Sequence, residues 1–429
     1  MTLCAWFNLH KRHTKRRMIC SEARGITSEE RREMRYRRRR SARERKKEER
    51  CAESDCFDSA MSYGHLWKSV RLSRRGVSWK GPVQRYIAKA PLYVYRTFWE
   101  LQNERFRSNG FFEFDIIERG KKRHIRSVSF YERVVQRCLC DWALVPVLRR
   151  TFVYDNGASL KGKGYSFAIR RLCCHLRDHY RKYGQEGYIL LFDFSKFFDN
   201  ISHETVKQIL RREFSDQKIR KLTEYFLTAF GDTGLGLGSQ ISQVLALASA
   251  NRLDHYVKEV LKIQGYGRYM DDGYLIHPDK AYLQKCLEEI GNICSELGIR
   301  LNKKKTQIVK LSHGFPYLKT RFYLTESGKV VRKLARSNIT RTRKKLKKLR
   351  HMVDAGMIGE EDVYMAFQSW RAHARQFHAF RTIRSMEKLC GELGFSWEKF
   401  EKNHSAGGER HGWQLHFPSG TRGIPEEHD

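Results

Sequence analysis

The sequence predicts an α+β fold that combines helices with an antiparallel sheet and carries a basic N-terminal extension. Residues 11–50 are basic and of low complexity, and they have no apolar stripe that could dock on a core. Residues from about 60 to 328 alternate between helical patterns and short strand patterns. Residues 336–390 return to a helical pattern and are strongly basic. These three observations divide the chain into an extension, a mixed centre and a helical end.

The charge of the chain predicts a polyanionic partner. Its 429 residues include 84 Lys or Arg and 48 Asp or Glu, which gives a formal net charge of +36. A field of this sign attracts nucleic acid, and the alternatives are an anionic membrane surface or no polyanion at all. No uncharged apolar run is long enough to span a bilayer. The eleven cysteines have no Cys-x-x-Cys spacing, which favours reduced thiols and a cytoplasmic location over a structural zinc site.

The elements of the mixed centre follow from hydrophobic periodicity. Regularly spaced aromatics from residue 60 indicate packed helices, and residues 110–130 alternate as a β-hairpin that turns at Gly120. Helical patterns follow at 131–150 and 165–183, and a buried strand then runs into a helix near Ser195. Later segments complete the pattern: helices at 239–263 and 279–297, short strands within 298–311 and 315–324, and a loose tail at 400–429.

Two adjacent carboxylates interrupt the apolar stretch GRYMDDGYLIH, residues 267–277. The pattern fits strand–turn–strand with Asp271 and Asp272 at the tip, and Asp193 ends the apolar run of another strand. Burying such carboxylates is expensive unless a cation compensates them. If the two strands are neighbours, the three aspartates could hold the two magnesium ions that nucleotide polymerisation needs. An ordinary surface β-turn is the alternative, and Asp199 is expected at the surface.

Three segments in this order, FDFSKFFDNISH, GLGLGSQISQ and YMDD, resemble the central motifs of reverse transcriptases of the bacterial and group II intron type. The likeness covers roughly residues 110–385. It implies a right-hand polymerase with a basic extension in residues 1–59, fingers and palm in 60–328, a basic helical thumb in 329–395 and a loose tail in 396–429. The implied enzyme is an RNA-directed DNA polymerase, a nucleotidyltransferase that uses two Mg²⁺ ions, with Mn²⁺ as a substitute. Its implied partners are an RNA template, a DNA or RNA primer and dNTPs, with a small accessory protein left open and no membrane.

The resemblance implies a set of catalytic and metal-binding residues. The metal ligands would be Asp193, Phe194, Asp271 and Asp272. Lys305, in the segment GIRLNKKKTQIVKL, would join the three aspartates as a catalytic residue that neutralises or protonates the leaving pyrophosphate. The alternative for Lys305 is an ordinary solvated lysine.

Substrate-binding residues are implied in the same way. Lys121 and Arg123 would hold the triphosphate, for which Arg and Lys are suitable partners, unless they are solvated hairpin charges. Phe198 would act as a steric gate that leaves no room for a 2′-hydroxyl, unless it only packs in the core. The segment DNGASLKGKGYSFAI would lie near the template. Three residues of LGSQISQ would contact the incoming nucleotide: Leu237, Gly238 and Gln243.

Two departures from the family pattern bear on the biological role and on one turn. Leu237 stands where the family usually has glutamine, and LGSQISQ resembles the variant found in diversity-generating retroelement enzymes. Loss of that polar contact predicts an error-prone enzyme, and the alternative is that Leu237 only packs in the palm while base-pair shape sets fidelity. A phage-defence or uncharacterised bacterial reverse transcriptase is the alternative, as is a non-catalytic RNA-binding splicing helper on the same scaffold. Lys319 stands where the hairpin FPYLKTRF usually has glycine, which leaves the geometry of that turn open.

Overall fold

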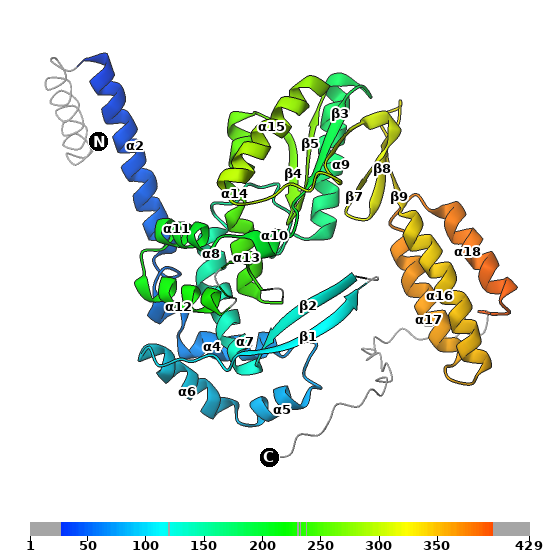
Figure 1. Cartoon of the computed structure of the whole chain (residues 1–429), viewed down its shortest axis with the longest axis horizontal. Coiled ribbons are helices and arrows are strands. Elements are labelled where there is room, and N and C mark those ends of the chain that lie inside the picture. Colours follow the sequence, from blue (N-terminus) through cyan, green and yellow to red (C-terminus); the bar gives the residue numbers. More distant parts are fainter. Residues whose placement is uncertain (1–26, 119–120, 230, 232, 237, 398–429) are drawn as a thin grey trace, which may run out of the picture. The chain divides into compact units, whose positions relative to one another are not determined.

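A computed structural model describes residues 27–118, 121–229, 231, 233–236 and 238–397 (Figure 1). The chain divides into two compact units, Met1–Lys310 and Leu311–Asp429. Helices are combined with a two-stranded, a four-stranded and a three-stranded sheet, all antiparallel, so the predicted α+β fold is confirmed. Among the described helices, none is both long enough and apolar enough to cross a membrane.

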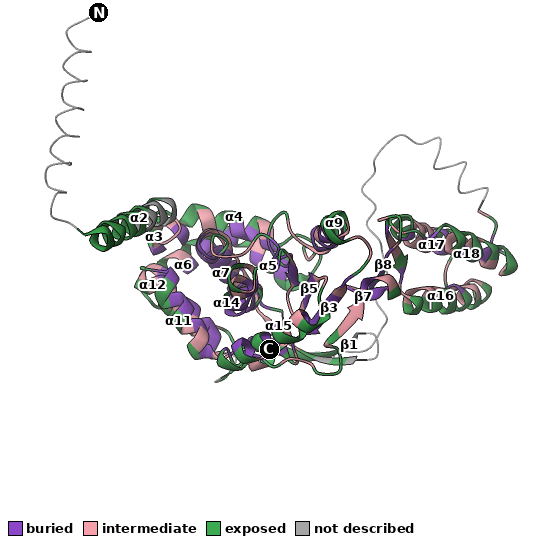
Figure 2. Cartoon of the chain, turned by 90° about the horizontal axis from the view of Figure 1, so that it is seen from above, coloured by how far each residue is buried: buried purple, intermediate pink, exposed green. Residues whose placement is uncertain are grey.

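The basic extension contains a long exposed helix, α2 (Ser28–Cys51). Every side chain of α2 whose burial is described is exposed, as the green ribbon of Figure 2 shows. Pairs such as Glu33 and Arg37, with a carboxylate–guanidinium distance of 2.9 Å, support the helix on its own surface. The missing apolar stripe explains why α2 has no face to bury.

Helices and a hairpin open the first unit. Aromatic and aliphatic residues bury one side of each helix, as their spacing predicts: α3 (Phe57–Ala60), α4 (Tyr63–Ser73), α5 (Gly81–Ala88) and α6 (Ala90–Gln102). The predicted hairpin is formed by β1 (Phe111–Glu118) and β2 (Lys121–Val128), and its turn at Gly120 lies outside the described residues. Three consecutive helices follow it: α7 (Phe130–Leu139), the π-helix η2 (Cys140–Leu144) and α8 (Val145–Leu148).

The four-stranded sheet carries the centre of the unit, in the order β4-β5-β3-β6. Its strands are β3 (Tyr188–Asp193), β4 (Gly265–Tyr269), β5 (Asp272–His277) and β6 (Gln307–Lys310). Residues 189–193 of β3 are all buried, as expected for a strand whose sequence is an unbroken apolar run. Two long helices pack on the sheet: α9 (Tyr165–Tyr183) and α15 (Lys280–Glu296).

Two helix expectations for this unit are corrected. The helix expected near Ser195 begins only at Phe197 as the short α10 (Phe197–Asn200), because Lys196 adopts a left-handed φ of 45°. The single helix expected over 239–263 is interrupted at Ala250, whose ψ of 3° leaves the helical region. The segment is therefore divided into α13 (Gln240–Ser249), α14 (Asn251–His255) and the π-helix η3 (Tyr256–Val260). Two further helices precede it: α11 (His203–Glu213) and α12 (Gln217–Thr228).

The second unit combines the three-stranded sheet with the basic helices. A short 3₁₀ turn, η4 (Leu311–His313), leads into the strands β7 (Phe315–Tyr317), β8 (Thr320–Leu324) and β9 (Val330–Leu334). The helical region expected over 336–390 consists of three helices: α16 (Arg336–Asp354), α17 (Glu360–Ala374) and α18 (Phe380–Glu392). Their shared core includes Leu346, Val363, Phe367, Met386 and Cys390.

The turn between β7 and β8 is strained. Tyr317 pairs with Thr320, so only Leu318 and Lys319 form the turn. Both have positive φ angles, 45° and 62°. Such two-residue turns favour residues such as Asn and Gly, because a side chain in the left-handed region clashes with its own backbone. Lys319 therefore fits the turn only at a conformational cost.

Replacing Lys319 by glycine should stabilise the second unit. Removing the left-handed strain gains about 1–2 kcal/mol, and the extra flexibility of glycine in the unfolded chain costs about 0.5–1 kcal/mol. We expect the free energy of unfolding of Lys319→Gly to rise by about 0.5–1 kcal/mol in urea denaturation of the full chain. Lys319→Ala is the matched control, since it removes the same charge but keeps the strain. A glycine variant no more stable than the alanine variant would contradict this reading of the turn.

Candidate active site

Two carboxylates face each other across neighbouring strands of the four-stranded sheet. Strands β3 and β5 are antiparallel neighbours, and Asp193 lies opposite Asp272 in their register. Asp193 is the last residue of β3 and is 5% exposed. Asp271 lies in the two-residue turn between β4 and β5 and, like Asp272, is half-buried. The three-aspartate hypothesis requires these two strands to be neighbours, and they are.

The backbone around these carboxylates is tightly constrained. Met270, the other turn residue, has a φ of 58°, which is rare for a residue with a side chain. Gly273 lies opposite Phe192, whose ring fills the space above it. A Cβ on Gly273 would lie 2.1 Å from Cζ of that ring, so only glycine fits. Phe194 is buried, and its backbone N–H donates to the carbonyl of Asp271 over 3.1 Å.

The carboxylates carry more negative charge than their surroundings neutralise. Burial first, and the charge of Asp193 after it, raises the pKa of Asp271. Burial, followed by the charges of Asp271 and Asp193, raises the pKa of Asp272 to about 7. Lys305 offsets part of this charge, since its Nζ lies 2.7 Å from Oδ1 of Asp193, and that hydrogen bond raises the pKa of the lysine. The amide of Asn302 donates to the other oxygen of Asp193 over 3.1 Å.

The donor set fits a hard divalent cation. Among the residues that the structure describes, no group of three or more His, Cys, Asp or Glu is arranged as a ready-made metal site. Mg²⁺ does not require one, because it is commonly held by one or two carboxylates together with water and substrate phosphates. The facing pair Asp193 and Asp272, with its uncompensated negative charge, suits that mode of binding.

The expected gate residue lies beside the glycine-rich segment that precedes α13. Phe198 is half-buried and makes an edge-on contact with the buried ring of Phe197, with 5.8 Å between the ring centroids. Its carbonyl accepts from the N–H of Leu235 over 2.7 Å. A Cβ on Gly234 would lie 2.9 Å from the carbonyl oxygen of Asp199, so the two segments approach as closely as glycine allows. Asp199 itself is exposed, as expected.

The structure describes some of the other expected substrate residues fully and others in part or not at all. Gly238 has a φ of 108°, and its missing Cβ would lie 3.5 Å from the carbonyl oxygen of Arg126 on β2. Gln243 is exposed, although its neighbours Ser242 and Val244 on α13 are buried. Leu237 lies outside the described residues. Only the backbone is described for Lys121 and Arg123 on β2. Lys121 pairs with Glu118, and Arg123 pairs with Ile116.

The start of α13 is held by α7 and η2 through two contacts that the sequence did not predict. Ser239 caps α13, and its hydroxyl donates to Oε1 of Gln136 over 3.0 Å. The amide of Gln240 donates to Oδ1 of Asp141 over 2.9 Å. The Ser-Gln pair thus anchors this segment to the preceding helices.

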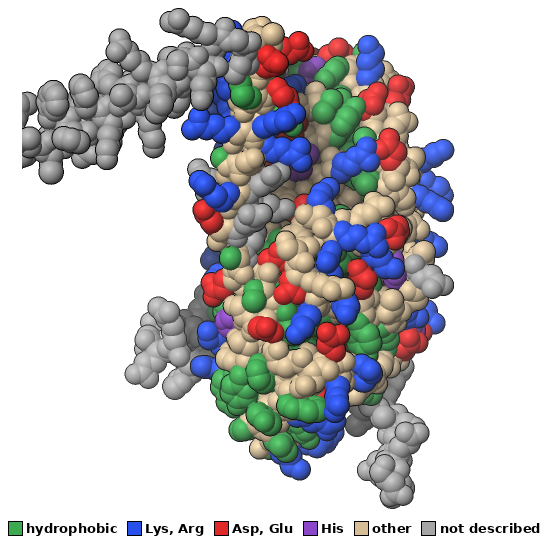
Figure 3. Space-filling model, turned by 90° about the vertical axis from the view of Figure 1, so that its left-hand side faces the viewer, with side chains coloured by type: hydrophobic (Ala, Val, Ile, Leu, Met, Phe, Trp, Pro, Cys, Tyr) green, Lys and Arg blue, Asp and Glu red, His purple; other side chains and the backbone are tan. Residues whose placement is uncertain are grey.

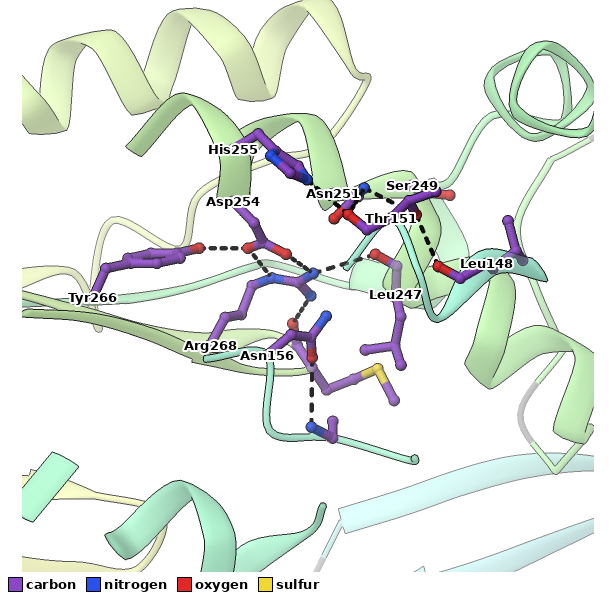
Figure 4. Close-up of polar contacts among 12 residues, drawn as sticks. Leu148, Thr151, Asn156, Leu247, Ser249, Asn251, Asp254, His255, Tyr266 and Arg268 are labelled. Carbon is purple, nitrogen blue, oxygen red and sulfur yellow. Dashed lines mark hydrogen bonds and ion pairs between the residues drawn. The ribbon is translucent and has the colours of Figure 1, made fainter. Parts of the chain in front are cut away.

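A buried ion pair contacts the backbone of the turn between β4 and β5 (Figure 4). Both side chains of the pair, Arg268 on β4 and Asp254 on α14, are completely buried, and their closest N–O distance is 2.6 Å. The hydroxyl of Tyr266 donates to the same carboxylate over 2.6 Å. The guanidinium also donates to the carbonyls of Met270, over 2.7 Å, and Leu247, over 3.2 Å. The strained turn residue is therefore fixed by a charged group that cannot move without losing its partners.

The backbone of Arg268 ties in a further segment. Its N–H donates to the carbonyl of Asp155 over 3.2 Å, and its carbonyl accepts from Gly157 over 2.8 Å. The segment expected near the template thus pairs with the strand that leads into the carboxylate turn. The arginine between the aromatic residues of β4 was the available signal, because a buried charge is rarely unpaired.

Weakening the contact between Arg268 and the turn should slow catalysis more than it weakens substrate binding. The variant Arg268→Lys keeps the positive charge at this position. A lysine side chain cannot, however, donate to Asp254, Leu247 and Met270 at once. We expect kcat for nucleotide incorporation to fall at least about tenfold, because small displacements of catalytic groups are costly, with little change in KM.

Tyr266→Phe is the matched control, since it removes one bond to Asp254 but leaves the contact between Arg268 and Met270. Thermal denaturation identifies a temperature at which both variants are folded. A wild-type kcat for Arg268→Lys at that temperature would show that the ion pair does not position the turn.

Comparison with known proteins finds a family match for part of the chain. Residues 118–322 match the family Reverse transcriptase (RNA-dependent DNA polymerase). Protein YkfC of Escherichia coli (strain K12) is 26% identical over 242 residues, which cover 46% of this chain and 62% of that protein. The chain thus spans less than two thirds of the length of this curated relative.

Solved structures of telomerases are also similar to the chain. Telomerase from Candida albicans, in complex with the TWJ fragment of telomeric RNA, has a TM-score of 0.45 at 12% identity, covering 74% of this chain and 63% of that one. Apo telomerase from Candida tropicalis has a TM-score of 0.42 at 13% identity, covering 52% and 48%. Scores below 0.5 support no conclusion about this chain. The match of residues 118–322, just under half of the chain, to the family Reverse transcriptase (RNA-dependent DNA polymerase) agrees with the resemblance seen in the motifs.

Proposed function

We propose that the whole protein is an RNA-directed DNA polymerase that adds deoxynucleotides to a primer with the help of two Mg²⁺ ions. One observation carries the proposal: Asp193 and Asp272 face each other in register, with Asp271 in the adjoining turn. Carboxylates on rigid strand ends keep a fixed geometry, which phosphoryl transfer requires. When bound, Mg²⁺ would supply charge stabilisation for the reacting phosphate and activation of the primer hydroxyl.

The residues of the chain would hold the reactants around these carboxylates. Asp193 and Asp272, with Asp271 and the backbone at Phe194, would bind the metal. The Nζ of Lys305 lies 2.7 Å from Oδ1 of Asp193, and this lysine would neutralise or protonate the leaving pyrophosphate. Its raised pKa keeps the ammonium charged at neutral pH, as either neutralising or protonating the leaving group requires.

The incoming nucleotide would lie between β2 and the start of α13. Lys121 and Arg123 would bind its triphosphate, and Leu237, Gly238 and the exposed Gln243 would contact it from the other side. The contact of Gly238 with the backbone of Arg126 supports this arrangement, because it brings the two segments together. Phe198 would close the space beneath the sugar.

The second unit would hold the template–primer duplex. Helix α16 exposes cations along its length, which suit phosphate contacts that do not read sequence: Arg341, Lys344, Lys345, Lys347 and Lys348. An RNA template, a DNA or RNA primer and dNTPs are the proposed partners, and a small accessory protein stays a prediction. The domain limits at residues 59, 328 and 395 and the cytoplasmic location stay predictions as well.

The biological role that the motifs favour is a prokaryotic retroelement of the diversity-generating kind. Leu237 and the Ser-Gln form of its segment support that role. The alternatives are a phage-defence or uncharacterised bacterial reverse transcriptase and a non-catalytic splicing helper. A template repeat with a near-copy that differs at adenines in the neighbouring DNA would favour the retroelement.

Removal of a carboxylate tests the proposed activity. Asp193→Asn or Asp271→Asn should abolish Mg²⁺-dependent dNTP incorporation on a primed RNA template, because one metal-binding charge is lost, while RNA affinity stays largely unchanged. Asp199→Asn, an exposed aspartate six residues after Asp193, is the control and should remain active. Incorporation at the wild-type level by either active-site variant would refute the assignment of these aspartates. An inactive wild-type protein would instead favour the splicing helper.

Replacement of the gate residue tests sugar selection. Phe198→Ala opens space beneath the ribose and should raise ribonucleotide incorporation relative to deoxynucleotide incorporation by about tenfold or more. Phe197→Leu, a conservative change in the neighbouring buried ring, is the control and should keep the wild-type preference. The two preferences are measured as ratios of kcat/KM for dNTP and rNTP. If Phe198→Ala discriminates as strongly as the wild type, Phe198 serves packing alone.

A further inference from the structure

The helices that precede the β1–β2 hairpin expose aromatic and basic side chains together. Residues 62–110 contain ten Lys or Arg and only two acidic residues, Glu100 and Glu104. Both glutamates have cationic partners: Glu100 binds Arg96 over 2.7 Å, and Glu104 binds Lys221 over 3.6 Å. This part of the first unit is therefore a positively charged surface whose few negative charges are already paired.

Aromatic rings are exposed on the same helices. Tyr63 and Trp67 lie one turn apart on α4, with exposed fractions of 41% and 37%, and their rings are nearly parallel. Tyr95 and Trp99 lie one turn apart on α6, with exposed fractions of 61% and 44%. Tyr63 touches Phe98 of α6 edge-on, with 6.4 Å between the ring centroids, so the two helices meet beside these rings. Large exposed aromatics on neighbouring helices mark an interaction surface.

Cations accompany these rings. Lys68 and Arg71 follow Trp67 by one and four positions on α4, and both are exposed. The guanidinium of Arg105 lies over the ring of Trp99, 5.1 Å from its centroid. Figure 3 shows hydrophobic side chains and Lys or Arg gathered at the lower end of the view, the end at which α5 and α6 lie in Figure 1. We define the α4–α6 surface by Tyr63, Trp67, Lys68, Arg71, Tyr95, Trp99 and Arg105.

We infer that the α4–α6 surface binds single-stranded RNA outside the catalytic centre. Bases of a single strand stack on aromatic rings while its phosphates contact Lys and Arg, and this combination is what the surface offers. A duplex hides its base faces and would leave the rings unused. A protein partner is the alternative occupant, because Tyr, Trp and Arg are also enriched at protein interfaces, and the test below distinguishes the two. The surface belongs to α4, α6 and the residues after α6, whereas the carboxylates belong to β3, β5 and the turn before β5.

The bound strand would be the part of the template that does not yet pair with the primer. That identification rests on the proposed polymerase function, whereas the binding of single-stranded RNA does not. The two can therefore fail separately.

The test uses the full chain and a labelled 12-nucleotide oligo(U) RNA, followed by fluorescence anisotropy at several salt concentrations. Replacing three rings together, Tyr63→Ala, Trp67→Ala and Trp99→Ala, should weaken binding at least about tenfold without changing its salt dependence, since no phosphate contact is lost. Lys68→Ala with Arg71→Ala should instead reduce the slope of log K against log salt by about 1.4, because each single-strand phosphate contact contributes about 0.7. Tyr183→Ala, which removes a 52% exposed ring from α9, is the control and should bind like the wild type.

Primer extension separates the binding site from the active site. The triple aromatic variant should extend a primer normally when only a few template nucleotides lie beyond it, and poorly when the single-stranded template is long. Circular dichroism and thermal denaturation check that the variant is folded. An unchanged affinity for oligo(U) in the folded triple variant would overturn the inference. A second outcome would also overturn it: the wild-type protein sediments as a dimer, and the triple variant is a monomer with unchanged oligo(U) affinity. The rings would then form a protein interface. If the wild-type protein extends no primer at all, the polymerase proposal fails, while the oligo(U) measurements still decide whether this surface binds RNA.

Discussion

The antiparallel pairing of β3 with β5 places Asp193 directly opposite Asp272, and much of the surrounding structure compensates this arrangement. Like charges opposite each other in a sheet destabilise it, and burial increases the cost. Lys305 and Asn302 each bind one oxygen of Asp193, while burial, followed by the charges of Asp271 and Asp193, still raises the pKa of Asp272. A pairing this unfavourable is understandable if the site binds a cation, so the feature that strains the free protein is also the feature that supports its proposed function.

The buried pair Arg268–Asp254 serves geometry more than stability. Moving both charges out of water costs about as much as their attraction returns, and apolar residues often stabilise a core equally well. Apolar residues cannot donate a hydrogen bond to the carbonyl of Met270. This residue, next to Asp271, has an unfavourable left-handed backbone conformation. Strain of this kind persists only where neighbouring contacts determine the backbone. The ion pair provides those contacts, and it also ties β4 to α14 and to the end of α13.

Local patterns in the sequence predicted most elements and the carboxylates, because both depend on neighbouring residues. An apolar run ending in Asp193 predicts a buried strand, and an Asp-Asp pair between two apolar runs predicts a turn. The partner of Arg268 was not predictable, since Asp254 is fourteen positions away and only the packing of α14 on the sheet brings them together. The interruption at Ala250 was missed because alanine favours a continuous helix. The side chains of Lys121 and Arg123 and the position of Leu237 stay sequence predictions, so the nucleotide-contacting part of the site rests on the motifs.

The proposed reaction would bring a negatively charged phosphate to a site that already contains three carboxylates. Exposed cations on α2, α4 and α16 would attract the proposed nucleic acid, and at physiological salt the field of each cation reaches only about 8 Å. Asp193, Asp271 and Asp272 are the local exception, and their negative charges, which add to burial in raising the pKa of Asp272, would repel a phosphate. Lys305 cannot neutralise both a carboxylate and the phosphate, because the ammonium that neutralises Asp193 cannot also bind the phosphate at full strength. A bound divalent cation would supply the positive charge that both groups need. The charges of the described residues are thus consistent with the proposed metal-dependent reaction.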